Sequence, residues 1–349
     1  MAGRAVKIAE VASAAGVGVG TVSRVLNGSP QVRDETRKRV LAVIQQLGYR
    51  PSRLASGLAL GATRSVAVLV PFMTRPSVVG RLAGIVAVLD AEGFDCVVCN
   101  IETAEQRDRH LRGFADLHRV DGMLVVSIPL HQGQVDAIAA TGLPLVLVDA
   151  DAPGVPRVVI DNVAGGMLAT DHLLALGHRR IAFIGDTSRR GMGFLSNARR
   201  LEGYRRALRA AGVTPAPELV RRGPHGGAVA GSIALDLLQR DDAPTAIFAA
   251  SDTQAAGVLQ AAKKVGCRVP RDLSVIGFDD VETAELLGLS TIRQPLARSG
   301  ELGARMLCSL IRGDPVPAGR TTLPLELVRR TSTAELVTRS RAPTLVSAS

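Results

Sequence analysis

Two short stretches at the start of the chain carry apolar residues at helical spacing. Residues 7–15 hold the first apolar set and residues 19–26 the second, and Gly16 interrupts the pattern between them. Two short helices joined by a tight glycine-containing turn form a helix-turn-helix, whose second helix lies in the DNA major groove. The pattern therefore predicts a DNA-binding head. The outward-facing positions of its second helix are small or hydrogen-bonding, and none is acidic: Gly20, Thr21, Arg24 and Asn27.

Further helical signals follow in the next forty residues. A third helix is predicted over residues 34–47, with Asp34 as its N-cap and Gly48 at its C-terminal end. A shorter helical pattern covers residues 52–59. Isolated helices this short are unstable in water and Gly57 adds a further cost, so this segment is expected to become helical on DNA. An ordinary interdomain linker is the alternative.

From residue 63 onward, near-continuous apolar strands alternate with helical stretches. The cycle restarts after Asp161 and Asn162, so it predicts two doubly wound lobes with parallel sheets. Ligands of such folds bind beyond the carboxyl ends of the strands, which favours a cleft between the lobes. The predicted fold class is an all-α head followed by a two-lobed α/β body. The expected strands span residues 65–71, 96–99 (taken as buried), 122–126, 143–148, 180–184, 219–221, 246–250 and 274–277.

These patterns divide the chain into four segments. Residues 1–50 form the DNA-binding domain, 51–62 the hinge helix or linker, 63–335 the two-lobed domain, and 336–349 an unstructured tail. The lobes are expected to exchange strands: lobe 1 takes residues 63–161 and 293–322, and lobe 2 takes residues 162–292 and 323–335.

The positive charge of the chain is concentrated in its first part. The whole sequence has 42 basic and 32 acidic residues, a formal net charge of +10. Residues 1–61 contain nine basic and three acidic groups, so this segment carries +6 and the remainder only +4. A basic head on a nearly balanced body is typical of proteins that neutralise DNA phosphates. A solvated basic face without a partner is the alternative, and the helix-turn-helix pattern argues against it.

Other patterns in the sequence narrow the function classes. No apolar run is long enough for a membrane helix, and the N-terminus lacks the apolar core of a signal peptide, so we expect a cytoplasmic protein without membrane contact. The four cysteines, including Cys96 and Cys99 in a lone C-x-x-C, are interpreted as core residues rather than metal ligands. We therefore expect neither a metal nor a cofactor.

Two other functions are alternatives to DNA-dependent regulation. A dinucleotide-binding oxidoreductase is suggested by Gly16-x-Gly18-x-Gly20, but a helix precedes this run and Thr21 stands where the motif needs glycine. No other nucleotide-binding or hydrolase motif occurs, so the chain is not expected to be an enzyme. A free sugar-binding protein would need a signal peptide and no basic head.

Several segments, in order along the chain, resemble the LacI/GalR family of bacterial transcriptional repressors. The resemblance covers about residues 6–333. It implies a homodimer bound to double-stranded DNA at a palindromic operator, with an effector domain of the periplasmic-binding-protein type. The segments that carry it are Gly16-Val17 with Thr21 to Gly28, Asp34 to Arg37, Leu47 to Pro51, His172 to Gly185, Arg200 to Tyr204, Ser274 to Asp280 and Leu323 to Thr333.

The resemblance also implies contacts with the operator. Arg24 stands where an arginine–guanine contact forms, and Leu58 stands where the family inserts an apolar wedge into the minor groove. Ser52 and Ala59 depart from the family pattern, which would weaken contacts between the hinge and phosphates. The implied contacts comprise base readers at Val19, Gly20 and Arg24, phosphate-positioning residues at Thr21, Ser23, Asn27 and Thr36, and the wedge Leu58.

For the cleft, the resemblance implies a small polar effector, a sugar or a related metabolite. An Arg with an Asp suits hydroxyl-rich ligands, and the Arg also suits carboxylates or phosphates. Asp161 and Asp279 have an alternative interpretation as strand-end or helix caps. Whether the effector releases or promotes DNA binding is left open, with release the usual sense. The implied effector contacts are Phe72, Ser127 and Asp161 from the first lobe and Arg200, Ser251 and Asp279 from the second.

The aromatic content qualifies the sugar interpretation. The chain has no Trp, two Tyr and seven Phe. Arg75-Pro76-Ser77-Val78-Val79 stands where the family commonly has asparagine, proline and two phenylalanines. We therefore expect a pocket without its usual aromatic wall and with an added positive charge at Arg75.

Overall fold

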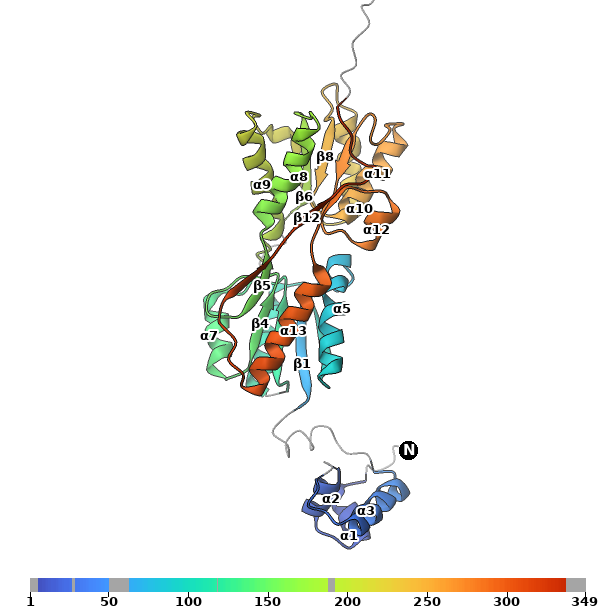
Figure 1. The fold of residues 1–349 in the computed structure, drawn as a ribbon, viewed down its shortest axis with the longest axis vertical. Helices are drawn as coiled ribbons and strands as arrows, with labels where there is room; N and C mark the ends of the chain where they lie inside the picture. Colours follow the sequence, from blue (N-terminus) through green and yellow to red (C-terminus); the bar gives the residue numbers. More distant parts are fainter. Residues whose placement is uncertain (1–5, 27–28, 50–62, 118, 188–191, 337–349) are drawn as a thin grey trace, which may run out of the picture. The chain divides into compact units, whose positions relative to one another are not determined.

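The computed structural model describes residues 6–26, 29–49, 63–117, 119–187 and 192–336. It divides into two compact units: the head, residues up to Ser65 together with 119–121, and the body, which holds the rest (Figure 1). The expected hinge at 51–62, with Ser52, Leu58 and Ala59, lies outside the described residues, as do Asn27 and all of the expected tail except residue 336.

The head is a three-helix unit built on a small apolar core. Its helices are α1 (Ile8–Ala15), α2 (Val19–Leu26) and α3 (Asp34–Leu47), and the side chains of Val11, Val22 and Val40 are fully buried among them. Gly16 and Gly48 end α1 and α3 with φ angles of 64° and 63°. Glycine adopts this left-handed conformation without steric cost, which explains why the pattern breaks there.

One detail of the predicted head is wrong. Asp34 is the first residue of α3, and the N-cap is Arg33. Val19 begins α2 and is 44% exposed, unlike Val22 and Val25, which are buried.

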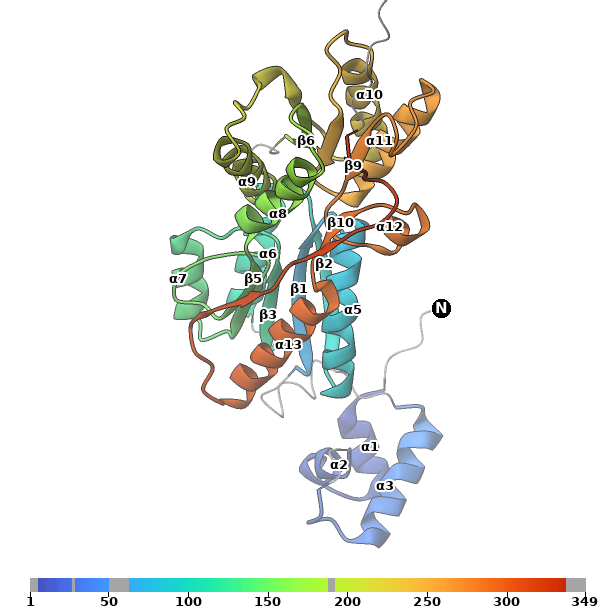
Figure 2. The same ribbon diagram turned by 45° about the horizontal axis from the view of Figure 1, so that its top comes forward.

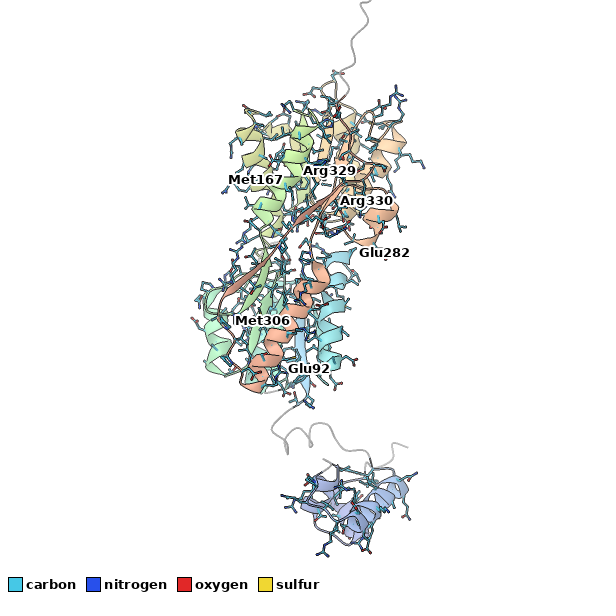
Figure 3. The ribbon with its side chains drawn as sticks, in the orientation of Figure 1. Glu92, Met167, Glu282, Met306, Arg329 and Arg330 are labelled. Atoms are coloured by element: carbon cyan, nitrogen blue, oxygen red, sulfur yellow. The ribbon has the colours of Figure 1, made fainter. Side chains whose placement is uncertain are left out.

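Lobe 1 of the body is a six-stranded sheet with the order β11-β5-β4-β3-β1-β2. The pairs β1–β3, β3–β4, β4–β5 and β5–β11 are parallel. Helices α5 (Pro76–Ala91) and α13 (Leu296–Arg312) pack on one face, where Met306 of α13 lies (Figure 3). Helices α6 (Ala104–Leu117) and α7 (Gln132–Ala140) complete the lobe. The strands are β1 (Ser65–Pro71), β2 (Asp95–Ile101), β3 (Gly122–Val126), β4 (Leu145–Val148), β5 (Arg157–Ile160) and β11 (Arg320–Leu323).

Lobe 2 is a four-stranded parallel sheet with the order β7-β6-β8-β9. One apolar cluster joins the sheet to α8 (Asn162–Ala175) and α9 (Ser196–Ala210), and another joins it to α10 (Gly227–Leu238) and α11 (Asp252–Lys264). Figure 2 shows the two helix pairs on the two sides of this sheet. The strands are β6 (Ile181–Asp186), β7 (Val220–Gly223), β8 (Ala246–Ala249) and β9 (Ser274–Ile276), and the short helices are a 3-10 turn at Pro217–Leu219 and α12 (Glu282–Leu286).

The chain passes between the lobes three times. The first crossing follows β5, and the other two involve β10 (Thr291–Arg293) and β12 (Glu326–Val328), which pair in an antiparallel ribbon. The crossings place Gln294 between the lobes, where it contacts groups from both.

The predicted fold class is confirmed, with corrections in detail. The expected buried strand at 96–99 is instead the edge strand β2, and Val97 and Val98 are each 38% exposed. An edge strand has only one neighbour, so its apolar run is less covered than the run of a central strand. The prediction omitted β5 and every element after β9.

In the described part of the chain, every helix is too short or too polar to cross a bilayer. The same residues contain no group of three or more His, Cys, Asp or Glu side chains arranged to hold a metal ion.

Candidate functional site

The outer side of α2 carries the residues expected to read DNA. Val22 and Val25 are buried against the other helices, while Gly20 and Arg24 are exposed on the opposite side and Val19 is exposed at the first residue of the helix. The expected phosphate-positioning residues Thr21 and Ser23 of α2 and Thr36 of α3 are half-buried. The head therefore presents a short face that is free of acidic groups, at the place where a helix-turn-helix contacts bases.

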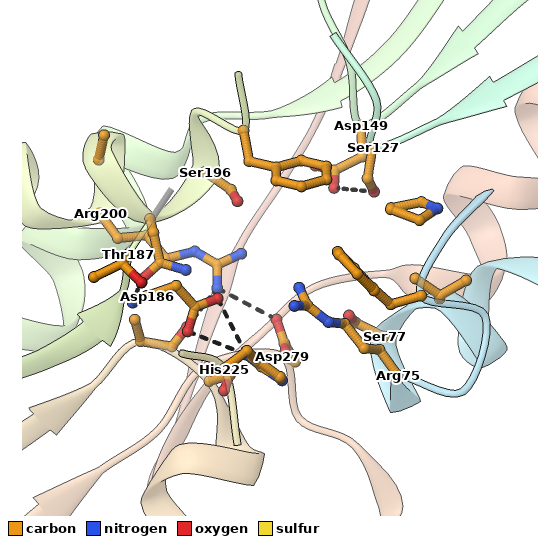
Figure 4. Close-up of a pocket in the computed structure, with 18 of the residues that line it drawn as sticks. Arg75, Ser77, Ser127, Asp149, Asp186, Thr187, Ser196, Arg200, His225 and Asp279 are labelled. Carbon is orange, nitrogen blue, oxygen red and sulfur yellow. Dashed lines mark hydrogen bonds and ion pairs between the residues drawn. The ribbon is translucent and has the colours of Figure 1, made fainter. Parts of the chain in front are cut away.

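The body contains a cavity of about 270 Å³ that both lobes line. From lobe 1, Phe72 follows β1, Ser127 follows β3 and Asp149 follows β4. From lobe 2, Asp186 ends β6 and Ser251 follows β8. The cavity thus lies beyond the carboxyl ends of both parallel sheets, where doubly wound folds bind their ligands (Figure 4).

Backbone strain is concentrated around this cavity. Six non-glycine residues of the described chain have positive φ angles, and four of them line it. Their φ angles are 48° for Phe72, 52° for Ser127, 55° for Asp149 and 115° for Asp279. Such conformations cost about 1–3 kcal/mol each and are retained mainly where function requires them.

A buried ion pair forms the lobe 2 wall of the cavity. The guanidinium of Arg200 lies 3.6 Å from Asp279 Oδ1, and both side chains are less than a tenth exposed (Figure 4). Arg200 Nε donates to Asn162 Oδ1 at 2.9 Å, and its Nη1 donates to the carbonyl of Ala250 at 2.5 Å. The ring of Phe278 lies 3.6 Å below the guanidinium. These contacts hold Arg200 in one orientation toward the cavity.

A chain of polar contacts continues from this pair into lobe 1. Gln294 donates from Nε2 to Asp279 Oδ1 at 2.5 Å and accepts at Oε1 from Arg81 Nη2 at 2.8 Å. Arg81 is also paired with Asp149 at 3.0 Å, and Asp149 accepts from Ser127 Oγ at 2.7 Å. Because one amide connects the charged groups of both lobes, a ligand that disturbs either end would change the interlobe contact.

A second polar group on the lobe 2 wall is centred on Asp186 (Figure 4). Asp186 is 3.1 Å from His225 Nδ1 and accepts from Gln254 Nε2 at 2.9 Å. Arg222 and Thr187 line the cavity beside it. Carboxylates that keep lone pairs available next to hydroxyl and guanidinium donors can bind sugar-like hydroxyl groups.

Comparison with known proteins places both parts of the chain. A family model described as "Bacterial regulatory proteins, lacI family" matches residues 7–52, and one described as "Periplasmic binding protein-like domain" matches residues 170–333. The HTH-type transcriptional regulator DegA of Bacillus subtilis (strain 168) is 35% identical, over 95% of this chain and 99% of its own length. The chain belongs to the lacI family.

Other lacI-family proteins match over nearly the full length. The HTH-type transcriptional regulator CelR of Thermobifida fusca is 35% identical, over 92% of this chain and 96% of CelR. A structure of a CelR–cellobiose complex aligns with a TM-score of 0.68 and 33% identity, over 94% of this chain and 99% of that one. A Lac repressor dimer bound to operator and the anti-inducer ONPF aligns with a TM-score of 0.82 and 28% identity, over 95% and 100%.

The family membership confirms the resemblance and the general function. The chain is a bacterial transcription regulator with a DNA-binding helix-turn-helix head and a periplasmic-binding-protein-like effector domain. The relatives described above are regulators rather than enzymes.

Five of the six expected effector contacts line the cavity, and Asp161 does not. Its exposed carboxylate accepts from the backbone N–H groups of Val163 at 2.9 Å and Ala164 at 3.0 Å, so it caps α8. This was the alternative interpretation of Asp161, and helix capping fully accounts for the residue. Ser251 has both roles: it lines the cavity, and it caps α11 by accepting from the N–H of Gln254 at 3.3 Å.

Several cavity residues were missed by the sequence analysis. Asp149 and Asp186 could have been found, since Asp149 directly follows the expected strand 143–148 and Asp186 lies two residues beyond the expected strand 180–184. Arg81 and Gln294 gave no local signal. Ser77 and Val78 line the cavity where the family's usual aromatic wall was expected to be missing, but Phe194 was not foreseen, and it pairs with the expected Phe72 at a ring-centroid distance of 6.0 Å.

Burial changes the titration of the acids near the cavity. Burial raises the pKa of Asp279 from its ordinary value, while the positive charges of Arg200 and Arg81 oppose that rise. Burial and the charge of Asp279 raise the pKa of Asp252 to about 7. Asp252 lies one residue beyond the cavity wall and accepts from Thr291 Oγ1 at 2.6 Å.

Proposed function

We propose that this regulator represses transcription as a homodimer on a palindromic operator, and that a small polar metabolite in the interlobe cavity controls its operator affinity. The observation that carries the proposal is the buried Arg200–Asp279 pair, held by second contacts and facing a cavity between two lobes. Concave sites with a few convergent polar groups and shifted pKa values are typical of ligand binding. The related structures described as complexes with operator and with cellobiose support the same assignment.

In the head, α2 would read the major groove. Arg24 is exposed and long enough for a bidentate contact with guanine, and Val19 offers a methyl surface for thymine. Gly20 has no side chain to read with and would allow close approach. Thr21, Ser23, Asn27 and Thr36 would position the phosphates, and Leu58 would act as the minor-groove wedge.

Exposed apolar residues on the body support dimerisation. On α5, Val79 is 51% exposed and Val86 is 45% exposed, and at the end of α12 Leu286 is 79% exposed and Leu287 is 46% exposed. Figures 1 and 2 both show α5 and α12 on the same side of the body, and Figure 3 marks Glu282 at the start of α12. Exposed large apolar side chains on one side of a domain can form part of a protein interface.

Regulation would follow from unequal binding to two lobe arrangements. A ligand shifts an equilibrium only by its difference in affinity for the two states. Gln294 links the charged groups of both lobes, so a ligand that contacts Asp279 or Asp149 would favour one arrangement. We expect ligand to release the operator, and the opposite preference would give a corepressor.

Operator binding is tested with the full-length protein. Selection from random duplexes should return a palindromic motif, sedimentation should show a dimer, and affinity should fall steeply with salt. Recovery of no common motif would overturn the proposed function.

The cavity assignment needs a separate test. Arg200→Lys keeps a positive charge beside Asp279 but removes the planar fork that holds two acceptors. We expect operator affinity to stay within about twofold and the response to bound metabolite to fall at least tenfold. If operator binding by Arg200→Lys still responded fully to the metabolite, the interlobe cavity would not be the effector site.

A further inference from the structure

We propose that the metabolite is acidic: a carboxylate or a phosphate group on a hydroxyl-bearing body of monosaccharide size. This inference rests on the proposed role of the cavity and adds the chemical class of its ligand. It derives from the charges, the dimensions and the apolar corner of the cavity.

The cavity lining carries more positive than negative groups. Four arginines line it (Arg75, Arg81, Arg200 and Arg222), against three aspartates (Asp149, Asp186 and Asp279). Each aspartate is already matched within the lining. Asp149 pairs with Arg81 at 3.0 Å, Asp279 with Arg200 at 3.6 Å, and Asp186 with His225 at 3.1 Å.

Arg222 contributes most clearly to the excess of positive charge in the cavity lining. It belongs to β7, lies opposite Gly185 of β6, and is exposed at the cavity wall. Among the residues that the structure describes, it has no ion-pair partner. A guanidinium placed this way can form two parallel hydrogen bonds to a carboxylate or phosphate.

Arg75 brings a second guanidinium to the same cavity from lobe 1. It precedes α5, and its guanidinium lies 4.3 Å over the ring of Phe72. The first turn of α5 contains no acidic residue, and Ser77 and Val78 from that turn also line the cavity. The positive end of this 16-residue helix therefore adds to the potential that the two arginines create.

One buried donor strengthens the case for an acceptor-rich ligand. Arg81 is 3% exposed, and its Nε has no hydrogen-bond partner among the described residues, although both Nη atoms do. An unpaired buried donor is costly, and a ligand oxygen or an ordered water could satisfy it.

The rest of the lining suits a compact body with hydroxyl groups. Carboxylate oxygens of Asp149, Asp186 and Asp279 can accept from hydroxyls, and Phe72 with Phe194 provides an apolar corner against a carbon skeleton. The volume of about 270 Å³ is at the small end for ligand sites. A single sugar unit fits this size better than a disaccharide.

Matched probe pairs test the charge requirement. Binding of gluconate, glucuronate and glucose 6-phosphate to the full-length protein is measured by calorimetry and compared with glucose, and ribose 5-phosphate is compared with ribose. Acetate and inorganic phosphate test the anion alone. At least one sugar acid or sugar phosphate should bind tenfold or more tightly than its neutral parent and more tightly than the free anion. The carboxylate and phosphate arms then distinguish the two acid types.

Three variants locate the effect. Arg222→Gln and Arg75→Gln should each weaken the acidic probe about tenfold or more, because a charge-assisted hydrogen bond is lost. Arg221→Gln is the matched control, because Arg221 neighbours Arg222 on β7, is also exposed and is not part of the cavity lining. The affinity of this variant for the acidic probe should be unchanged.

Other outcomes overturn the inference. A neutral sugar that binds as tightly as its acid, an acidic probe insensitive to both variants, or no binding by any probe would each contradict it. Operator selection does not depend on these probes, so a palindromic motif combined with neutral-sugar binding would leave the proposed function standing while this inference fails.

Discussion

The head and the body hold their candidate functional residues in opposite ways. In the head, Val19 and Arg24 lie outside the core that Val22 and Val40 form. In the body, Arg200 and Asp279 are almost entirely buried and are hydrogen-bonded on several sides.

The physical reason is the size of the ligand. DNA brings its own extended surface, so side chains that read it can project from a stable domain. A small metabolite must be enclosed to be recognised, and buried charges persist only if they are paired and hydrogen-bonded. Cavity residues in the body therefore contribute to folding, while the expected DNA readers in the head need not.

The largest effect should come from removing the buried cation. Arg200→Ala leaves Asp279 without its ion-pair partner and frees the acceptors of Asn162 and Ala250. Breaking a buried pair costs about 3–5 kcal/mol, so the urea midpoint of the full-length protein should fall clearly.

The control for this prediction is Arg206→Ala on the same helix. Arg206 is exposed and pairs with Glu202 at the surface, so the change should stay below about 1 kcal/mol. If both variants lost the same free energy of unfolding, burial of the Arg200 ion pair would not contribute to stability as we expect.

Asp252 should make the stability of the body depend on pH. Its folded-state pKa is raised to about 7 by burial and by Asp279, above the ordinary value of 3.8. The folded state therefore binds this proton more tightly than the unfolded state, so its contribution is present at low pH and is lost as pH rises through about 7. The slope is at most about 1.4 kcal/mol per pH unit.

Asp252→Asn tests this dependence because it keeps a neutral group in place. Its amide can accept from the N–H of Val281 and donate to Thr291 Oγ1, which contact the carboxylate in the native chain. Denaturation series between pH 5 and pH 8 should show a steeper loss of stability in the native chain than in the variant. Parallel curves would contradict the raised pKa.

The glycine contact that positions Arg200 should also be sensitive. A Cβ on Gly203 of α9 would lie 2.1 Å from the carbonyl oxygen of Val163 in α8. The helices must then separate, and we expect Gly203→Ala to lose about 1–3 kcal/mol and to weaken ligand binding. Gly113→Ala in α6 is the control, since its Cβ meets nothing within 4 Å and should stabilise by about 0.5–1 kcal/mol. If Gly203→Ala left the free energy of unfolding in denaturant unchanged, α8 and α9 would have room for the added methyl group.

The spacing of apolar residues along the sequence predicted several helices and strands accurately. The strands at 65–71 and 122–126 and the helix at 34–47 have the bounds that the sequence indicated. The short strand β5 was missed because its four residues follow a loop rich in Gly and Pro, where apolar periodicity has no room to develop.

The candidate site shows the same limit. Arg200 and Asp279 were found by resemblance to a family, and strand ends could have indicated Asp149. Gln294 contacts Asp279, which is 15 positions away in the sequence, and Arg81, which is 213 positions away. Only the folded arrangement of the crossings between the lobes brings these residues together. Asp161 lies outside the cavity lining and caps α8, and the sequence alone does not separate the two roles because a helix cap and a ligand carboxylate can both stand at the end of a strand.

The smallest effect on stability should come from the head, where Arg24 is exposed on α2. Arg24→Ala should change the free energy of unfolding by less than about 0.5 kcal/mol. It should still relax sequence preference at one base pair in each half-site by about 1–3 kcal/mol, because a bidentate guanine contact is lost. Affinities of the full-length protein for a set of single-substitution operators measure this directly. Thr36→Ala should instead weaken all of these operators alike, as expected for a phosphate contact. If Arg24→Ala also lowered every affinity equally, Arg24 would be a phosphate-positioning residue, and base reading would have to come from Val19 and the rest of the exposed face.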